Sequence, residues 1–258
     1  MKNTLKSVIT SATFVLACST LANAHYGMII PSDQMVVQGE ESTVNLDVRF
    51  WHPMEGIPMP LAKPAKFDVV ANGKTMDLLG SLQSKTVKEN QTWAISYKIK
   101  RPGLYVFSME PQPYWEPAED KFIIHYTKAV VTAYGNDEGW DEEIGLKTEI
   151  VPLAKPFGQY SGNVFQGIVK MNGKAIPYSE VEVEYYNEDG SRKAHNDYMI
   201  TQTIKADGNG VFTYAAPIAG WWGFAALNDA DFKIKHEGQD KDVELGAVLW
   251  VKFHDMVQ

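Results

Sequence analysis

The sequence predicts an all-β protein built from two consecutive β-sandwich domains. Three observations predict this class. The 258 residues include 20 Gly and 13 Pro, and 12% are aromatic, which favours many short strands joined by turns. Apolar and polar residues alternate with a period of two in several segments. Turn-forming pairs such as Asn72-Gly73, Pro102-Gly103 and Asp189-Gly190 separate these segments.

The first 24 residues are predicted to be an export signal. Lys2 and Lys6 form a basic start, an apolar stretch runs from Val8 to Ala17, and Ala22-Asn23-Ala24 is a small-x-small cleavage site. The apolar stretch is too short to span a bilayer stably. We therefore expect a periplasmic protein. A lipoprotein cut before Cys18 is the alternative, because Val15-Leu16-Ala17-Cys18 loosely fits a lipidation motif.

The charge balance excludes several classes of partner. The chain has 24 Lys and Arg against 32 Asp and Glu, a net charge of −8. Loss of Lys2 and Lys6 with the signal would leave 22 basic and 32 acidic residues, so the mature charge would be −10. Such a protein is not expected to bind nucleic acid, and it would rather attract cations. Cys18 is the only cysteine, so cleavage after Ala24 would leave no thiol for disulfides, thiolate catalysis or zinc–thiolate sites.

Residues 25–134 are predicted to form an immunoglobulin-like sandwich. In the segment Val44–Phe50, apolar residues at even positions alternate with polar residues, as in a half-buried strand. Five further strands are expected in this domain: Phe67–Ala71, Trp93–Ile99, Leu104–Met109, Phe122–Tyr126 and Val130–Tyr134.

Residues 135–161 are irregular and acidic, and we interpret them as a connecting segment before a second small sandwich at 162–258. Glu180, Glu182 and Glu184 alternate with apolar residues, so we expect them on a solvent-exposed face. The strands expected in this domain are Val164–Val169, Val181–Tyr185, a strand opening at Val211, Gly220–Leu227 and Val243–Phe253.

Cleavage after Ala24 would make His25 the first residue of the mature chain. The α-amine and Nδ1 of an N-terminal histidine can close one chelate ring around a metal ion. Since the α-amine has a pKa of roughly 7.7–8.0, it can lose its proton to a metal near neutral pH. The alternative is that His25 is incidental, because signal peptidase must leave some residue first.

Two more histidines are candidate ligands. His52 follows the strand that ends near Phe50, where loops commonly gather binding sites. His125 lies in an apolar strand and would be a ligand, or a group that orients one. For His52 the alternative is a histidine at the edge of the core that is hydrogen-bonded to a backbone carbonyl.

Acidic residues crowd the approach to His125. Glu116 and Glu119 could supply oxygen ligands or a local negative field that gathers cations. The alternative is a solvated acidic loop. The predicted metal ligands are therefore His25, His52, His125, Glu116 and Glu119, all in the first domain.

No catalytic signature is present in the sequence. It lacks a Gly-x-Ser-x-Gly elbow, a His-Glu-x-x-His helix, a phosphate-binding glycine loop and a dinucleotide fingerprint. We therefore expect a binding protein rather than an enzyme.

Four stretches resemble a known family of bacterial exported proteins: His25-Tyr26-Gly27-Met28, Phe50-Trp51-His52-Pro53, the run from Pro113 to Tyr126, and Gly220-Trp221-Trp222-Gly223-Phe224. This family is classified as a domain of unknown function and is often labelled the periplasmic component of cobalt or nickel uptake systems. The second half also resembles transthyretin-like or carboxypeptidase-regulatory-like sandwiches, through Asn172-Gly173-Lys174 and the Asp207-to-Phe212 turn.

The resemblance implies a periplasmic component of metal uptake that binds nickel or cobalt and presents it to an inner-membrane transporter. Copper is the chemical rival, because an open nitrogen-rich site favours Cu²⁺ on affinity alone. A structural or ligand-binding sandwich without a metal is the alternative from another class.

Overall fold

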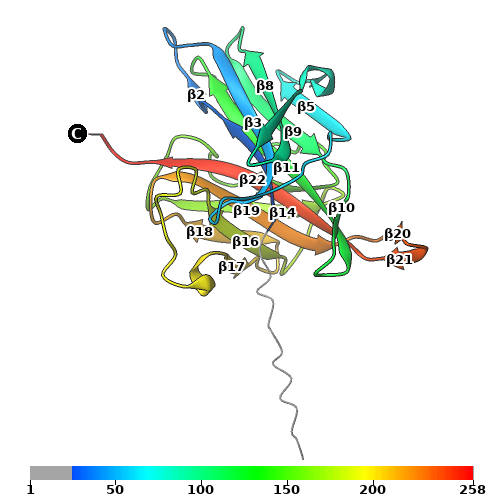
Figure 1. Ribbon diagram of the computed structural model, residues 1–258. Coiled ribbons are helices and arrows are strands. Elements are labelled where there is room, and N and C mark those ends of the chain that lie inside the picture. The colour runs from blue at the N-terminus through cyan, green and yellow to red at the C-terminus, as the bar shows by residue number, and fades with distance from the viewer. Residues whose placement is uncertain (1–24, 258) are drawn as a thin grey trace, which may run out of the picture.

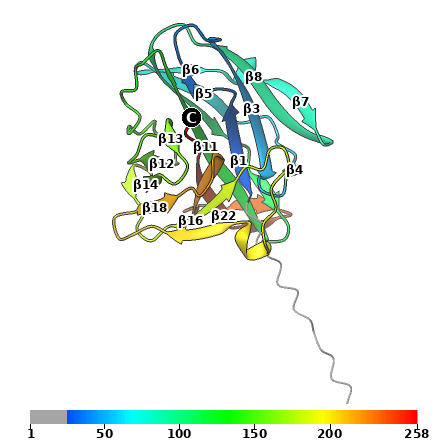
Figure 2. The same cartoon turned by 90° about the vertical axis from the view of Figure 1, so that its left-hand side faces the viewer.

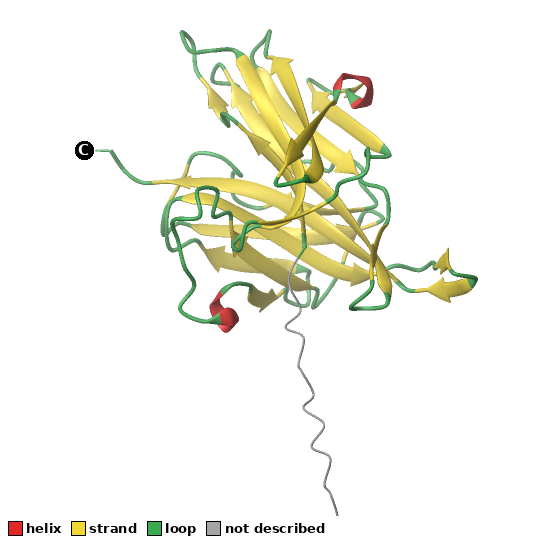
Figure 3. Cartoon of the chain, in the orientation of Figure 1, coloured by secondary structure: helices red, strands yellow, loops and turns green. Residues whose placement is uncertain are grey.

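The structure is a computed structural model that describes residues 25–257. The predicted signal peptide and Cys18 lie outside the described residues. Strands dominate the described part of the chain, where the helical segments are two single 3₁₀ turns, η1 (Leu79–Ser81) and η2 (Asp197–Met199) (Figure 3). The prediction of an all-β protein is confirmed. Among residues 25–257, no helix has the length and apolar character needed to cross a membrane.

Four strands form the path of the smaller sheet of the first half, in the order β1-β3-β8-β7, and β4 adds to β3. The period-two pattern predicted β3 correctly, because Val44, Leu46, Val48 and Phe50 are all buried. The strands are β1 (Tyr26–Pro31), β3 (Thr43–His52), β4 (Ile57–Met59), β7 (Gln83–Val87) and β8 (Asn90–Lys98).

The largest sheet runs through both halves of the chain (Figures 1 and 2). Its order is β17-β16-β19-β22-β11-β9-β5-β6, with β10, β2 and β13 attached at the side. The members are β2 (Met35–Val36), β5 (Lys66–Ala71), β6 (Lys74–Asp77), β9 (Gly103–Glu110), β10 (Tyr114–Glu116), β11 (Lys121–Ala133), β13 (Gln159–Tyr160), β16 (Glu180–Tyr185), β17 (Gln202–Lys205), β19 (Gly220–Asp229) and β22 (Val243–His254).

Two smaller sheets complete the second half. One contains β12, β14, β15 and β18, and the other is the hairpin β20–β21, which stands clear of the body in Figure 1. The strands are β12 (Thr148–Pro152), β14 (Val164–Met171), β15 (Lys174–Ala175), β18 (Val211–Ala215), β20 (Ile234–His236) and β21 (Gln239–Lys241).

Strand β11 joins the two halves, because it pairs antiparallel with β9 and parallel with β22. The hydrogen-bonded sheet is therefore continuous across the boundary predicted near residue 134. The sequence predicted two strands where the structure has one, since Thr127 and Lys128 interrupt the apolar run. Lys128 is nevertheless buried, and its Nζ lies 2.7 Å from Oε2 of the equally buried Glu149 on β12. The neighbouring carboxylate is what makes a lysine tolerable there.

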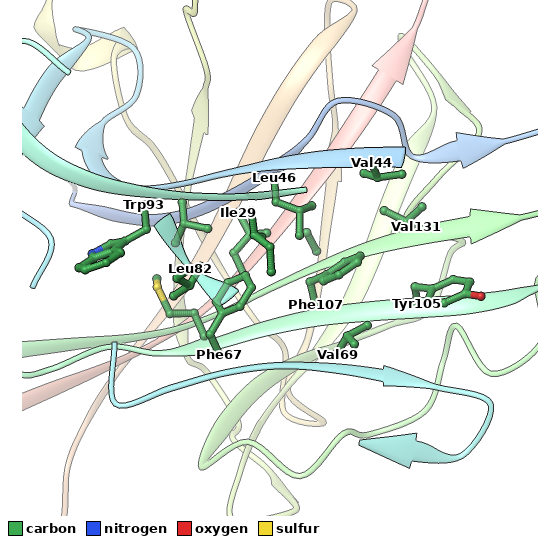
Figure 4. Packing of buried hydrophobic residues seen from close by; sticks show 14 of the residues in the cluster. Ile29, Val44, Leu46, Phe67, Val69, Leu82, Trp93, Tyr105, Phe107 and Val131 are labelled. Atoms are coloured by element: carbon green, nitrogen blue, oxygen red, sulfur yellow. The ribbon is translucent and has the colours of Figure 1, made fainter. Parts of the chain in front are cut away.

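The first hydrophobic core lies between the sheet of β1, β3 and β8 and the strands β5, β9 and β11 (Figure 4). Leu46 and Trp93 point into it from one side, and Phe67 and Phe107 point into it from the other. The second core lies between β16, β19 and β22 and the sheet of β14 and β18. It includes Phe165, Phe212 and Phe224.

Strand β1 contacts both halves. Ile29 faces the first core, whereas Tyr26, Met28 and Ile30 on the opposite side pack against residues of β19 and β22 such as Trp250. The indole Nε1 of Trp250 donates a hydrogen bond of 2.8 Å to the carbonyl of Gly27. Both ends of this contact are buried, so β1 is held rigidly between the two halves.

The face of β16 that carries three glutamates departs from the prediction. Glu180 is exposed as expected, but Glu182 is half-buried and Glu184 is only 1% exposed. The Thr201 hydroxyl and the backbone N–H of Met54 both donate hydrogen bonds to the Glu184 carboxylate. The sequence pattern could not predict this burial, because it follows from the packing of distant segments onto β16.

Glu184 should make folding stability depend on pH. Burial raises its pKa from the ordinary value of 4.5 to about 8. A carboxyl group whose pKa is higher in the folded protein than in the unfolded chain stabilises the folded state when it is protonated. This stabilisation is complete below the pKa of the unfolded chain, and it is lost as the pH rises through the pKa of the folded protein. Between pH values of about 4.5 and about 8, we expect the melting temperature of the wild type, measured with EDTA, to fall more than that of Glu184→Gln. An equal fall in melting temperature for the wild type and Glu184→Gln would contradict the raised pKa of Glu184.

Candidate functional site

The paired strands β1 and β3 bring two predicted ligands together. Tyr26 lies opposite Trp51 in the antiparallel register, and continuing this register by one residue places His25 beside His52. The ring centroids of the two histidines are 4.5 Å apart. His52 is 7% exposed, which agrees with its predicted position on the apolar face of the strand.

Glu116 reaches the same place from β10. Its Oε2 lies 2.9 Å from Nε2 of His25, and both side chains are about 10% exposed. Its Oε1 accepts a hydrogen bond of 2.9 Å from the backbone N–H of Ala118. The backbone N–H of Ala118 therefore orients the Glu116 carboxylate, and this carboxylate contacts the Nε2 edge of the His25 ring.

Aromatic rings surround the two histidines on the core side. Phe50 stacks on His25 with centroids 5.6 Å apart, and Tyr114 lies 6.0 Å from His25 and 5.0 Å from Phe50. Burial, followed by the charge of Glu116, raises the pKa of Tyr114. The phenol is therefore held neutral, and the site is largely shielded from water on this side.

His125 lies deeper and has different neighbours. Its ring is 5.9 Å from Phe50, edge to face, and it is 2% exposed. Neither ring nitrogen has a hydrogen-bond partner among the described residues. Nε2 lies 3.7 Å from Oε1 of Glu244 on β22, which is too long for a hydrogen bond. The structure thus brings His125 to the same end of the first core, with Glu244 as its charged neighbour.

Glu244 and Gly246 are parts of this region that sequence analysis missed. Burial alone would raise the pKa of Glu244, but His125 and Lys121 beside it lower the pKa to about 2. Gly246 lies opposite His125 in the parallel register, and a Cβ there would meet Cδ2 of His125 at 2.3 Å. Both residues are about 120 positions from His125 in the sequence, so no local signal connects them to it.

A cavity of about 50 Å³ adjoins His125. It is mostly apolar and is lined by residues that include Phe50, Met109, Tyr114, Ile123 and His125. A volume of this size holds one or a few small molecules such as water.

Glu119 is placed differently from the other predicted ligands. It is exposed, and its Oε2 lies 2.6 Å from Nζ of Lys121, which also contacts Glu244. Across residues 25–257, no group of three or more His, Cys, Asp or Glu side chains has an arrangement suited to a metal ion. Any metal site at His25 and His52 therefore requires a donor that is not one of these side chains.

On its other side, β10 is fixed by the hairpin β20–β21. The ring of Trp115 stacks on His236, with centroids 4.0 Å apart and planes 20° apart. Nζ of Lys241 lies 2.6 Å from Asp120 and 5.7 Å from the centroid of the Trp115 ring. These contacts hold the strand that presents Glu116.

The profile of the family described as "Domain of unknown function (DUF4198)" matches residues 22–230. The chain belongs to the DUF4198 family. The sequence search found no match among curated proteins. The expectation of a domain of unknown function is thereby confirmed, and the metal-transport label attached to such families stays a prediction.

Solved structures show only weak similarity to this DUF4198 chain. The native Escherichia coli α2-macroglobulin is 8% identical, with 89% of this chain and 14% of that chain covered and a TM-score of 0.24. The fibronectin(III)-like modules of Clostridium thermocellum CbhA are 9% identical, with 86% and 95% covered and a TM-score of 0.20. The D00-D0 domain of intimin is 11% identical, with 90% and 100% covered and a TM-score of 0.20. The chain spans about a seventh of the α2-macroglobulin chain.

The packing of His125 against Gly246 can be tested by substitution. Gly246→Ala should destabilise the protein by about 1–3 kcal/mol, because the new methyl group would overlap the imidazole. Denaturant unfolding monitored by tryptophan fluorescence measures this change. Gly80→Ala is the control, since a Cβ at Gly80 meets nothing within 4 Å. Adding His125→Ala should restore part of the loss, and a Gly246→Ala protein as stable as the wild type would refute the close packing.

Proposed function

We propose that the exported chain begins at His25 and binds one divalent transition-metal ion. The ligands would be the α-amine and Nδ1 of His25 together with a ring nitrogen of His52. The carrying observation is the contact of 2.9 Å between Nε2 of His25 and Glu116. This contact supports the chelate, because a carboxylate at Nε2 assigns Nδ1 to the metal, and only Nδ1 can close a ring with the α-amine of the same residue.

Glu116 acts in this proposal as an orienting acceptor rather than as a ligand. Metal-bound histidines commonly donate their second ring N–H to a carboxylate, which fixes the tautomer and the direction of the ring. With the proton on Nε2, Nδ1 is the ring nitrogen that carries the lone pair a metal would accept. Glu119 and His125 are not part of this ligand set. Glu119 contacts Lys121, and His125 lies beside Glu244.

The donor set narrows the cargo to metals that accept nitrogen ligands. An amine with two imidazoles suits nickel, cobalt and copper. We propose nickel or cobalt, which the family resemblance implies, with copper as the rival on affinity. The metal is cargo here, and we propose no catalytic turnover.

The wider role follows from the predicted signal and the resemblance. We propose a periplasmic protein that passes its metal to an inner-membrane transporter. The division into an immunoglobulin-like half and a transthyretin-like half is part of this proposal, and the two separate hydrophobic cores support it.

One observation favours a second candidate, a structural or ligand-binding sandwich that holds no metal. His25 and Glu116 form a nearly buried contact of 2.9 Å that closes the end of the first core by itself in this second candidate. In that case the pair would stabilise the fold, and His25 would have no affinity for metals.

The start of the mature chain is the first test. Intact-mass analysis of the protein exported by a bacterial host should give the mass of residues 25–258, because Ala22-Asn23-Ala24 is the predicted cleavage site. A lipidated terminus at Cys18, or a residue retained before His25, would remove the α-amine ligand and contradict the proposed site.

Metal titration of untagged protein is the second test. We expect about one Ni²⁺ or Co²⁺ per chain, with affinity that falls as the pH drops through the pKa values of the amine and the imidazoles. His25→Ala and His52→Ala should each weaken binding at least about tenfold, and Glu116→Gln about 10-fold to 100-fold. The exposed His195→Ala is the matched control. Unchanged titrations in both His25→Ala and His52→Ala would favour the second candidate.

A further inference from the structure

The two residues that follow His52 are tied to the second half of the chain. His52 is the last residue of β3, and the chain turns there at once, because the N–H of Gly56 donates a hydrogen bond of 2.9 Å to the His52 carbonyl. The carbonyls of Pro53 and Met54 and the N–H of Met54 lie within this turn. Backbone groups that are shielded from water need hydrogen-bond partners. For these three groups the partners come from β16 and from the loop after it.

Asn187, in the loop after β16, supplies two of the three partners. Its backbone N–H donates a hydrogen bond of 3.2 Å to the carbonyl of Pro53, and its Nδ2 donates one of 3.0 Å to the carbonyl of Met54. Nδ2 also donates to the carbonyl of Arg192 at 2.9 Å, and Oδ1 accepts a hydrogen bond of 3.0 Å from the N–H of Arg192. Asn187 is buried, and its own loop therefore holds the amide that reaches Met54.

Glu184 on β16 supplies the third partner. Its Oε2 accepts a hydrogen bond of 3.3 Å from the N–H of Met54, and its Oε1 accepts one from the Thr201 hydroxyl. Strand β16 is itself paired on both sides, with β17 and with β19. Three hydrogen bonds from a paired strand and its loop therefore fix the backbone directly after His52.

We propose that Asn187 is a positioning residue for the metal site, acting through the backbone that carries His52. This inference rests on the proposed nitrogen site. His25 directly precedes β1 and His52 ends β3, so the separation of 4.5 Å between their rings depends on where the backbone leaves β3. Ligand side chains must be held within about 0.5 Å of their working geometry. The proposed ligands all belong to the first half, yet the second half holds one of them in place.

The experiment compares the full mature protein with Asn187→Ala, which removes the amide that reaches Met54. Asn163→Ala is the matched control, because the Asn163 amide donates an exposed hydrogen bond of 3.2 Å to Gln159. We expect Asn187→Ala to weaken Co²⁺ binding about tenfold. It should also change the visible absorption spectrum of bound Co²⁺, which reports the geometry of the ligands. A residue that only stabilised the fold would lower the melting temperature and leave the affinity and the spectrum of the folded protein unchanged.

The outcomes separate this inference from the proposed function. If the wild type binds Co²⁺ and Asn187→Ala binds it with the same affinity and spectrum, the inference is overturned and the nitrogen site stands. A wild type that binds no Co²⁺ would overturn the nitrogen site and this inference together.

Hydrogen exchange of the wild type decides the question if Asn187→Ala fails to fold. Coupling between two sites is reciprocal, so bound Co²⁺ should stabilise the hydrogen bonds that position His52. We expect the metal to slow exchange in peptides that contain Met54 or Asn187. The N–H of Asn163, which donates a hydrogen bond of 3.0 Å to the Tyr160 carbonyl, should exchange at the same rate with and without metal. An unchanged rate at Asn187 would overturn the inference.

Discussion

The position of strand β1 is the constraint on which the rest of the structure depends. The strand pairs with β3 while its other side lies against β19 and β22, and the bond from Trp250 to the carbonyl of Gly27 fixes its depth. Gly27 is required at this point, because a Cβ there would lie 2.2 Å from Oγ1 of Thr127. The close approach of β1 to β11 thus needs a residue without a side chain.

The alternation of side chains along β1 gives the strand two different faces. His25 and Tyr26 are neighbours in sequence, yet they face opposite sides of the strand. His25 lies beside His52 and Glu116, and the ring of Tyr26 lies beside Gly223. One strand therefore carries a residue of the proposed nitrogen site on one side, while its other side packs against β19 and β22.

Local patterns predicted the strands well, because period-two alternation depends only on nearby residues. This is why β3, β5, β8, β9, β19 and β22 lie where the sequence places them. The predictions were wrong where a segment distant in sequence changes the surroundings of a residue. The sequence predicts a break in the strand at Lys128, but the carboxylate of Glu149 lies beside this lysine and the strand continues. It predicts a solvated Glu184, but Thr201 and the backbone of Met54 donate hydrogen bonds to this buried carboxylate.

The positions of the candidate ligands were predictable in part. The proximity of His25 and His52 agrees with the prediction that a terminal histidine meets a second one at a strand end. The role of Glu116 as the partner of Nε2 depends on how β10 folds back, and the Glu244 and Gly246 surroundings of His125 depend on the parallel pairing of β11 with β22. Pairing between strands so far apart in sequence leaves no local pattern.

The most direct measurement compares nickel titrations of two proteins that differ by one residue, one starting at His25 and one that retains Ala24. Both keep every side chain of the site, but only the first has an α-amine on His25. The account predicts that retaining Ala24 weakens nickel binding at least about tenfold while the melting temperature without metal stays the same. Equal affinity in the two proteins would contradict the N-terminal chelate.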